Sequence, residues 1–252
     1  MRIALVVNPV TSSRESNLDT VVDMIHEAAA HGADIVLLGE MAVTGMVNND
    51  DPGHDRQCAE SVPGPLTNLL AETAMKLGIW LGIGILEIDG ARIYDTALLF
   101  SPSGAIRLKY RRIQPQWRGG NADPTVYSEG TEIPVVETDF GSVVFLVCGD
   151  LWDDDLRRRV RDVRPDMVLH PFARCFEDGS RDQVRWETNE LPEYQSRVAE
   201  IGAPLFGASY LSAGVVADEA VTYGGAMVID RNGQVLAAHP LDCAGILYFV
   251  SS

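Results

Sequence analysis

The sequence predicts an α/β fold in which mixed sheets carry helices on their outer faces. Two observations lead to this fold class. Strand-like apolar runs alternate with helical patterns in the first third of the chain and again around Cys148, as in parallel strands joined by crossover helices. Between these regions and near the end, short Gly- and Asp-containing turns join successive strands into antiparallel hairpins. The 252 residues suffice for one large α/β domain, so we expect residues 1–252 to form a single domain.

The first third contains two expected buried strands, residues 3–7 and 35–38, with a helix between them. Ser16 or Asn17 is a suitable N-cap for that helix, and Gly32 can end it. The second strand stops at Glu40. A carboxylate directly after an apolar strand either reaches solvent or faces a polar site, and the sequence leaves both open.

The middle of the chain predicts a loop over residues 48–65, a helix over 66–77 and then three hairpin-connected strands, 80–88, 93–100 and 105–113. The third of these strands ends with several cations. Strand alternation places Lys109 and Arg111 on one face and Tyr110 and Arg112 on the other. These cations either serve a functional site or form a charged edge that resists aggregation.

Residues 143–147 predict a strand buried on both faces, and Cys148 follows where the backbone leaves the sheet. Acidic residues and then arginines come next, in the order that suits the dipole of a helix. A thiol at a strand end and near a helix N-terminus is favoured as a thiolate nucleophile. The alternative is that Cys148 is a small core residue. Further elements are expected at residues 134–138, 167–170, 193–201 (a helix), 204–210, 225–229, 235–238 and 246–250.

Composition excludes several classes of function. The formal net charge of -16 disfavours binding to nucleic acid or to an anionic membrane. The chain begins with a strand-like run without a basic leader, and no apolar run approaches membrane-spanning length, so we expect a cytoplasmic protein. The four cysteines are widely spaced, and no His/Asp ligand spacing is present. We therefore expect neither a metal nor another cofactor.

Six segments in order now resemble the carbon-nitrogen hydrolase family, the nitrilase superfamily, over nearly the whole chain. They are LLGEMAVTGM, IYDTALLFSPSG, KYRRIQP, FGSVVFLVCGDLW, YQSRVAE and YGGAMVIDRNG. The resemblance implies an α-β-β-α sandwich, a Glu, Lys and Cys triad, and a homodimer or higher homo-oligomer. It implies that Glu40 is a general base, that Cys148 attacks an amide or nitrile carbon, and that a cation and the backbone N–H of Gly149 stabilise the oxyanion. The string CGDLW is more similar to amide-hydrolysing branches than to true nitrilases, which favours a small amide as substrate.

The sequence departs from the family pattern at the cation, because Arg112 stands where the resemblance expects the catalytic lysine. Three interpretations remain open. Arg112 replaces lysine as oxyanion donor; Lys109 reaches the site through a bulge; or the protein is a catalytically silent homologue that binds a ligand or regulates a partner.

Other positions bear on the site as well. Asp123 stands where many family members carry a second glutamate, and it is a candidate to orient the cation or the nucleophile. Gly149 replaces a usual aromatic or polar residue, which predicts a wider or differently shaped pocket. Arg174 could bind a substrate carboxylate or form a surface salt bridge, and Trp152 could line a pocket or belong to the core.

Overall fold

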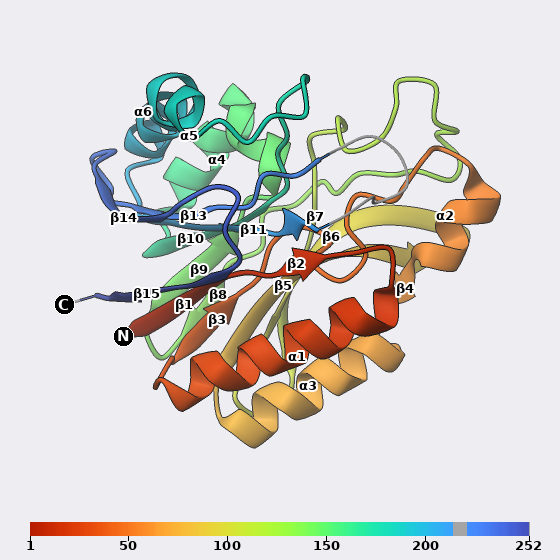
Figure 1. The fold of residues 1–252 in the computed structure, drawn as a ribbon, viewed down its shortest axis with the longest axis horizontal. Coiled ribbons are helices and arrows are strands. Elements are labelled where there is room, and N and C mark those ends of the chain that lie inside the picture. The colour runs from red at the N-terminus through yellow and green to blue at the C-terminus, as the bar shows by residue number, and fades with distance from the viewer. Residues whose placement is uncertain (214–220, 252) are drawn as a thin grey trace.

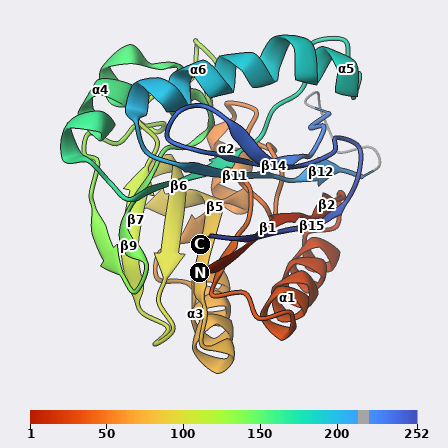
Figure 2. The same cartoon turned by 90° about the vertical axis from the view of Figure 1, so that its left-hand side faces the viewer.

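The computed structural model describes residues 1–213 and 221–251. Two sheets lie face to face, and helices cover the outer face of each, so the layers run helix, sheet, sheet, helix (Figures 1 and 2). The α/β class with mixed sheets is thereby confirmed, as is the α-β-β-α sandwich.

The first sheet has the strand order β15-β1-β3-β5-β6-β7, and β4 pairs with β5. Strands β1, β3 and β5 are parallel, whereas β6, β7 and β15 join by antiparallel pairing. Helices α1 and α3 pack on the outer face. The bounds are β1 Arg2–Val7, α1 Arg14–Ala30, β3 Ile35–Leu37, β4 Glu60–Ser61, α3 Pro65–Leu77, β5 Trp80–Asp89, β6 Arg92–Phe100, β7 Ile106–Arg111 and β15 Gly245–Val250.

The second sheet has the order β14-β13-β11-β10-β9-β8, and helices α4 to α6 lie over it. Its centre, β9-β10-β11, is parallel. A separate short pair joins β2 (Pro9–Val10) to β12 (Leu211–Ser212). The remaining bounds are β8 Val136–Thr138, β9 Gly141–Phe145, α4 Asp154–Val163, β10 Met167–Phe172, α5 Gln183–Arg185, α6 Leu191–Ile201, β11 Leu205–Ser209, β13 Ala226–Ile229 and β14 Val235–His239.

The core between the sheets follows from the two-residue period of a strand. In β1, Ile3, Leu5 and Val7 face the second sheet and pack in one cluster with residues such as Phe145. Ala4 and Val6 of the same strand face α1 and α3. A segment with both faces covered must be apolar, which is why residues 3–7 of β1 and residues 143–147 at the end of β9 read as unbroken apolar runs.

The structure corrects three local predictions. The expected loop 48–65 contains helix α2 (Pro52–Cys58), because Asp51 caps Gly53 N and Pro52 suits the first helical position. Helix α1 is capped by Ser13. The expected cap Asn17 instead donates from its amide to the carbonyls of Thr11 and Val43.

The third correction concerns the segment after the cysteine. A 3-10 turn, η1 (Cys148–Trp152), comes first, and α4 begins only at Asp154.

Among residues 1–213 and 221–251, none of the helices combines the length and apolar character that a membrane span requires.

Candidate active site

Three segments distant in the sequence meet at one rim of the sandwich: the ends of β3, β7 and β9. Glu40 follows β3, Arg112 follows β7, and Cys148 follows β9. Arg112 Nη1 lies 2.8 Å from Glu40 Oε1. Cys148 is close enough to alter the pKa of both the Glu40 carboxyl and the Arg112 guanidinium. The structure therefore brings together all three residues that the sequence singled out as a triad.

The backbone of Glu40 is fixed between the two sheets. Its N–H donates to the carbonyl of Phe172 in the second sheet (3.4 Å), while Gly84 N of the first sheet donates to Gly39 O (3.0 Å). Gly39 and Gly84 permit this approach, because a Cβ at Gly84 would lie 2.5 Å from Glu40 Cα and one at Gly39 would lie 2.8 Å from Tyr210 N.

The side chain of Glu40 is completely buried. Burial, and secondarily the neighbouring Cys148, raise the pKa of this carboxyl to about 8. A carboxylate with such a pKa is matched to proton transfer near neutral pH.

Arg112 points inward because β7 alternates regularly up to its end. The guanidinium is 3% exposed and donates to Glu40, to Asp95 Oδ2 (3.4 Å) and to Gln114 Oε1 (2.9 Å). Burial lowers its pKa, but Glu40, Cys148 and Asp95 raise it by more, so the net pKa lies above the ordinary arginine value. Arg112 is thus a permanent positive charge beside the base and the thiol.

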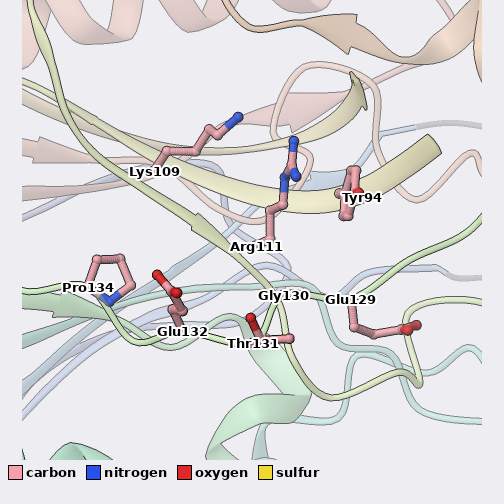
Figure 3. A pocket seen from close by; sticks show the side chains of 8 residues that line it. All are labelled: Tyr94, Lys109, Arg111, Glu129, Gly130, Thr131, Glu132 and Pro134. Carbon is pink, nitrogen blue, oxygen red and sulfur yellow. The ribbon is translucent and has the colours of Figure 1, made fainter. Parts of the chain in front are cut away.

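Lys109 and Arg111 lie on the opposite face of β7. Both donate to Glu87, Lys109 at 2.7 Å and Arg111 at 2.8 Å. They line a separate open cavity of about 300 Å³ with Tyr94, whose ring lies under the Arg111 guanidinium (Figure 3). The β6/β7 register shift lies before Lys109, and pairing is regular from there to Arg111. No bulge therefore turns Lys109 toward Glu40, and the second interpretation of the cation is wrong.

Cys148 occupies a strained position at the start of η1. Its backbone has φ of 41°, a left-handed conformation that costs a non-glycine residue about 1–3 kcal/mol. The residue is 7% exposed, and its Sγ lies 3.4 Å from the carbonyl oxygen of Ala173. Such a turn directs the thiol out of the strand end, toward Glu40 and Arg112.

A buried carboxylate, Asp150, holds this turn against the end of β7. It accepts hydrogen bonds from Val147 N (3.0 Å), Ile113 N (3.1 Å), Gln114 N (2.8 Å) and the Tyr110 hydroxyl (2.7 Å). The sequence suggested only a helix-dipole charge for Asp150. Its actual role is to connect the cysteine turn to the strand that carries Arg112.

Asp95 is a member of the cluster that the sequence did not reveal. It is 1% exposed on β6, contacts the Arg112 guanidinium, and is a hydrogen-bond partner of the Glu40 carboxyl. Burial first, and then the charge of Glu40, raise the Asp95 pKa well above its usual range. Asp95 is therefore harder to ionise than an ordinary aspartate. The signal was a carboxylate in the buried run YDTALLF.

Asp123 is not brought to the site. Its side chain is exposed and accepts from the backbone N–H and hydroxyl of Thr125 (2.8 and 2.7 Å), as in a loop turn. The second carboxyl that contacts the Arg112 guanidinium, besides Glu40, is Asp95. The position of Asp123 in the sequence was a poor guide, because the length of a loop does not determine where its side chains point.

Arg174 and Trp152 lie together near the cysteine. The Arg174 guanidinium is 4.5 Å from the Trp152 ring centroid and donates to Glu190 (2.8 Å). Trp152 packs edge-on against Tyr194 (4.7 Å). Among the described residues, the buried hydroxyl of Tyr194 has no hydrogen-bond partner. Cys148 alters the pKa of both Arg174 and Tyr194, which places this polar and aromatic group beside the thiol.

Comparison with known proteins finds relatives over much of the chain. The chain is 30% identical over 178 residues to an omega-amidase of Danio rerio, covering 68% of this chain and 63% of that protein. It is 29% identical over 155 residues to an aliphatic nitrilase of Sinorhizobium fredii, covering 56% and 49%. These alignments span about half to two thirds of the relatives' own lengths.

A solved structure of an amidase from Nesterenkonia sp. superposes with a TM-score of 0.79 at 24% identity, covering 98% of this chain and 89% of that one, which shows the shared fold. The family model for carbon-nitrogen hydrolases matches residues 2–249. The chain therefore belongs to the carbon-nitrogen hydrolase family.

Proposed function

We propose that this protein is an amidase that hydrolyses a small amide through a thioester on Cys148. The observation that carries the proposal is the buried contact of a high-pKa carboxyl, Glu40, with a permanent cation, Arg112, beside a thiol on a strained turn. Base, oxyanion donor and nucleophile are the three groups that thiol-dependent acyl transfer needs.

The first half of the reaction forms the acyl-enzyme. Glu40 takes the proton from Cys148 Sγ while the sulfur attacks the amide carbon, and the carbonyl oxygen becomes an oxyanion. Arg112 and the N–H of Gly149 stabilise that charge. The C–N bond then breaks, Glu40 passes its proton to the departing nitrogen, and ammonia leaves a thioester.

The second half releases the acid. Glu40 removes a proton from a water molecule, which attacks the thioester carbon. When the C–S bond breaks, the proton returns from Glu40 to Cys148, so every proton passes through the same carboxyl. Arg112 is suited only to electrostatic work, because guanidinium keeps its proton throughout.

The substrate class follows from the relatives and from the residues near the thiol. Relatives are named omega-amidase and aliphatic nitrilase, and a cysteine mutant of the Nesterenkonia amidase has been solved in complex with butyramide. Trp152 and Arg174 are proposed to contact the acyl part of the substrate. Arg174 is close enough to Cys148 for the two groups to interact electrostatically, the Trp152 ring lies against the Arg174 guanidinium, and Glu190 holds that guanidinium in place.

Ammonia release from short aliphatic amides, including butyramide, tests the proposal. We expect turnover by the wild type, none by Cys148→Ala, and a mass increase of one acyl group on the Cys148 peptide when the reaction is quenched. If the wild type releases no ammonia but Arg112→Lys does, the protein is the silent homologue. Acyl transfer to Cys58, Cys175 or Cys243 would also refute the assignment.

A further inference from the structure

Gly149 lies directly against the Arg112 guanidinium. A Cβ built on Gly149 would be 2.3 Å from Arg112 Nη2, 2.7 Å from Gln114 Oε1 and 3.2 Å from Arg112 Cζ. The backbone of Gly149 is not in the left-handed region, so it could carry a side chain without backbone strain. The nearest groups that oppose a side chain here are the guanidinium and Gln114.

The guanidinium has no freedom to withdraw. Nη1 donates to Glu40 (2.8 Å), and Nη2 donates to Gln114 Oε1 (2.9 Å). Gln114 is itself fixed, because its Oε1 accepts from Gln116 N (2.8 Å) and its backbone N–H donates to Asp150 (2.8 Å). Any atom added at Gly149 must therefore break a buried, charge-assisted hydrogen bond or move the cysteine turn.

We propose that Gly149 is a positioning residue for Arg112, and that the absence of a side chain there lets the guanidinium reach the backbone beside the nucleophile. This inference rests on the proposed function, in which Arg112 and the Gly149 N–H act on one oxyanion. The Arg112 guanidinium fills the room that the missing side chain leaves. At this point the pocket is therefore differently shaped, and not wider.

A lysine at position 112 would remove the conflict with the guanidinium nitrogen. Its chain ends one atom earlier than that of arginine, with Nζ near the place of Cζ, so it has no counterpart of Nη2. The nearest atom of residue 112 to a Cβ at Gly149 would then lie at about the 3.2 Å of Cζ, and the Gln114 Oε1 at 2.7 Å, which Nη2 would no longer bind, would be the remaining close contact. An arginine at position 112 thus needs a glycine at position 149, whereas a lysine removes the shortest of the contacts that a side chain there would make.

A double-mutant cycle tests the pairing: wild type, Gly149→Ala, Arg112→Lys and the double variant, assayed on an amide that the wild type hydrolyses. We expect Gly149→Ala to lower kcat by about 100-fold, the typical effect of losing an oxyanion donor, with KM changed less than roughly threefold. In the Arg112→Lys background, Gly149→Ala should change kcat by less than about fivefold. Gly120→Ala is the matched control, because a Cβ at Gly120 meets open space.

Denaturant midpoints of the same four proteins separate this inference from the proposed function. Gly149→Ala should lower the midpoint clearly in the wild type and little in the Arg112→Lys background. If the wild type has no amidase activity, the proposed function fails, while the midpoints still show whether the pair is coupled. Equal effects of Gly149→Ala in both backgrounds, or a wild-type kcat that survives it, would overturn the pairing. If Arg112→Lys is inactive, the kcat comparison cannot be made in that background, and the pairing is then overturned when Gly149→Ala lowers the denaturant midpoint equally in both backgrounds.

Discussion

The pKa of Glu40 sets the pH at which this site can work. Burial and the adjacent Cys148 raise that pKa to about 8, so at pH 6 the carboxyl is protonated and cannot accept a proton. We expect kcat/KM for an amide to rise with pH and to level off above about 8. Glu40→Gln should remove activity at every pH. A profile already flat at pH 6 would contradict the base role of Glu40.

The raised pKa of Asp95 predicts which substitutions the position tolerates. A protonated aspartate donates a hydrogen bond to Glu40 and so lowers the pKa of Glu40; the amide of asparagine can do the same. Asp95→Asn should therefore keep kcat/KM within about tenfold, whereas Asp95→Ala should lose about 100-fold. The pH profile of Asp95→Ala should also shift upward. Equal losses in both variants would mean that Asp95 acts as an anion.

The sequence predicted Glu40 and Cys148 because each comes at the end of an apolar run, where a polar residue is conspicuous, and Arg112 because it stands where the family resemblance expects the catalytic lysine. It did not predict Asp95 or Asp150, whose roles depend on which distant backbone groups surround them. Asp150 has four donors, two of them from the segment after β7, and no local pattern encodes that meeting. The opposite faces of Lys109 and Arg112 were predicted correctly, because strand alternation is local.

At the scale of elements, η1 and the end of β7 form one unit through Asp150. Asp150→Ala would leave one buried N–H group, two partly buried N–H groups and the Tyr110 hydroxyl without their acceptor. We expect it to reduce the free energy of unfolding by about 3 kcal/mol or more and to abolish turnover. Tyr110→Phe removes only one of these bonds and should cost about 1 kcal/mol. Denaturant titration distinguishes the two, and similar losses would show that Asp150 is not the connecting group.

Gly84 of strand β5 packs directly against the backbone of Glu40. Gly84→Ala would place a methyl group 2.5 Å from Glu40 Cα and must shift the Glu40 backbone, which cannot rotate away. Because misplacement by about 1 Å can cost about 100-fold, we expect a kcat loss of that order.

Gly82→Ala, on the same face of β5, is the control. Its methyl group would meet Leu37 Cδ1 at 2.8 Å, the flexible end of a side chain. Stability should fall while kcat stays near the wild-type value. If both variants lose kcat equally, close packing in general, and not the approach to Glu40, is responsible.

The predicted strands largely coincide with the observed ones, because buried strands read as apolar runs bounded by turn residues. Helix α2 was missed, since its seven residues, PGHDRQC, contain no apolar period and depend on the Asp51 cap and on tertiary contacts. The 3-10 turn after Cys148 was also missed. There Asp150 binds the backbone of Val147 and holds the chain in a tight turn before α4 starts.

For the whole molecule, the site depends on both sheets. Glu40 and Arg112 come from the first sheet and Cys148 from the second, and β3 and β9 meet through the apolar core between them. Phe145→Ala would open a cavity in that core, with an expected cost of about 3–5 kcal/mol. We expect kcat to fall as well, although the Phe145 side chain itself has no group that could take part in the reaction. Unchanged kcat in a destabilised Phe145→Ala protein would show that the two sheets do not need close registration.

Because the triad is divided between two sheets, the catalytic rate is sensitive to any displacement of one sheet relative to the other. The Glu40 N–H donates across the plane between the sheets to the carbonyl of Phe172 at 3.4 Å, a longer bond than the 3.0 Å one from Gly84 N to Gly39 O within the first sheet. As the urea concentration rises, the rate of hydrolysis should therefore decline before circular dichroism or tryptophan emission registers any loss of structure. The reason is that a displacement of a fraction of an ångström separates Glu40 from Cys148 Sγ while each sheet stays folded.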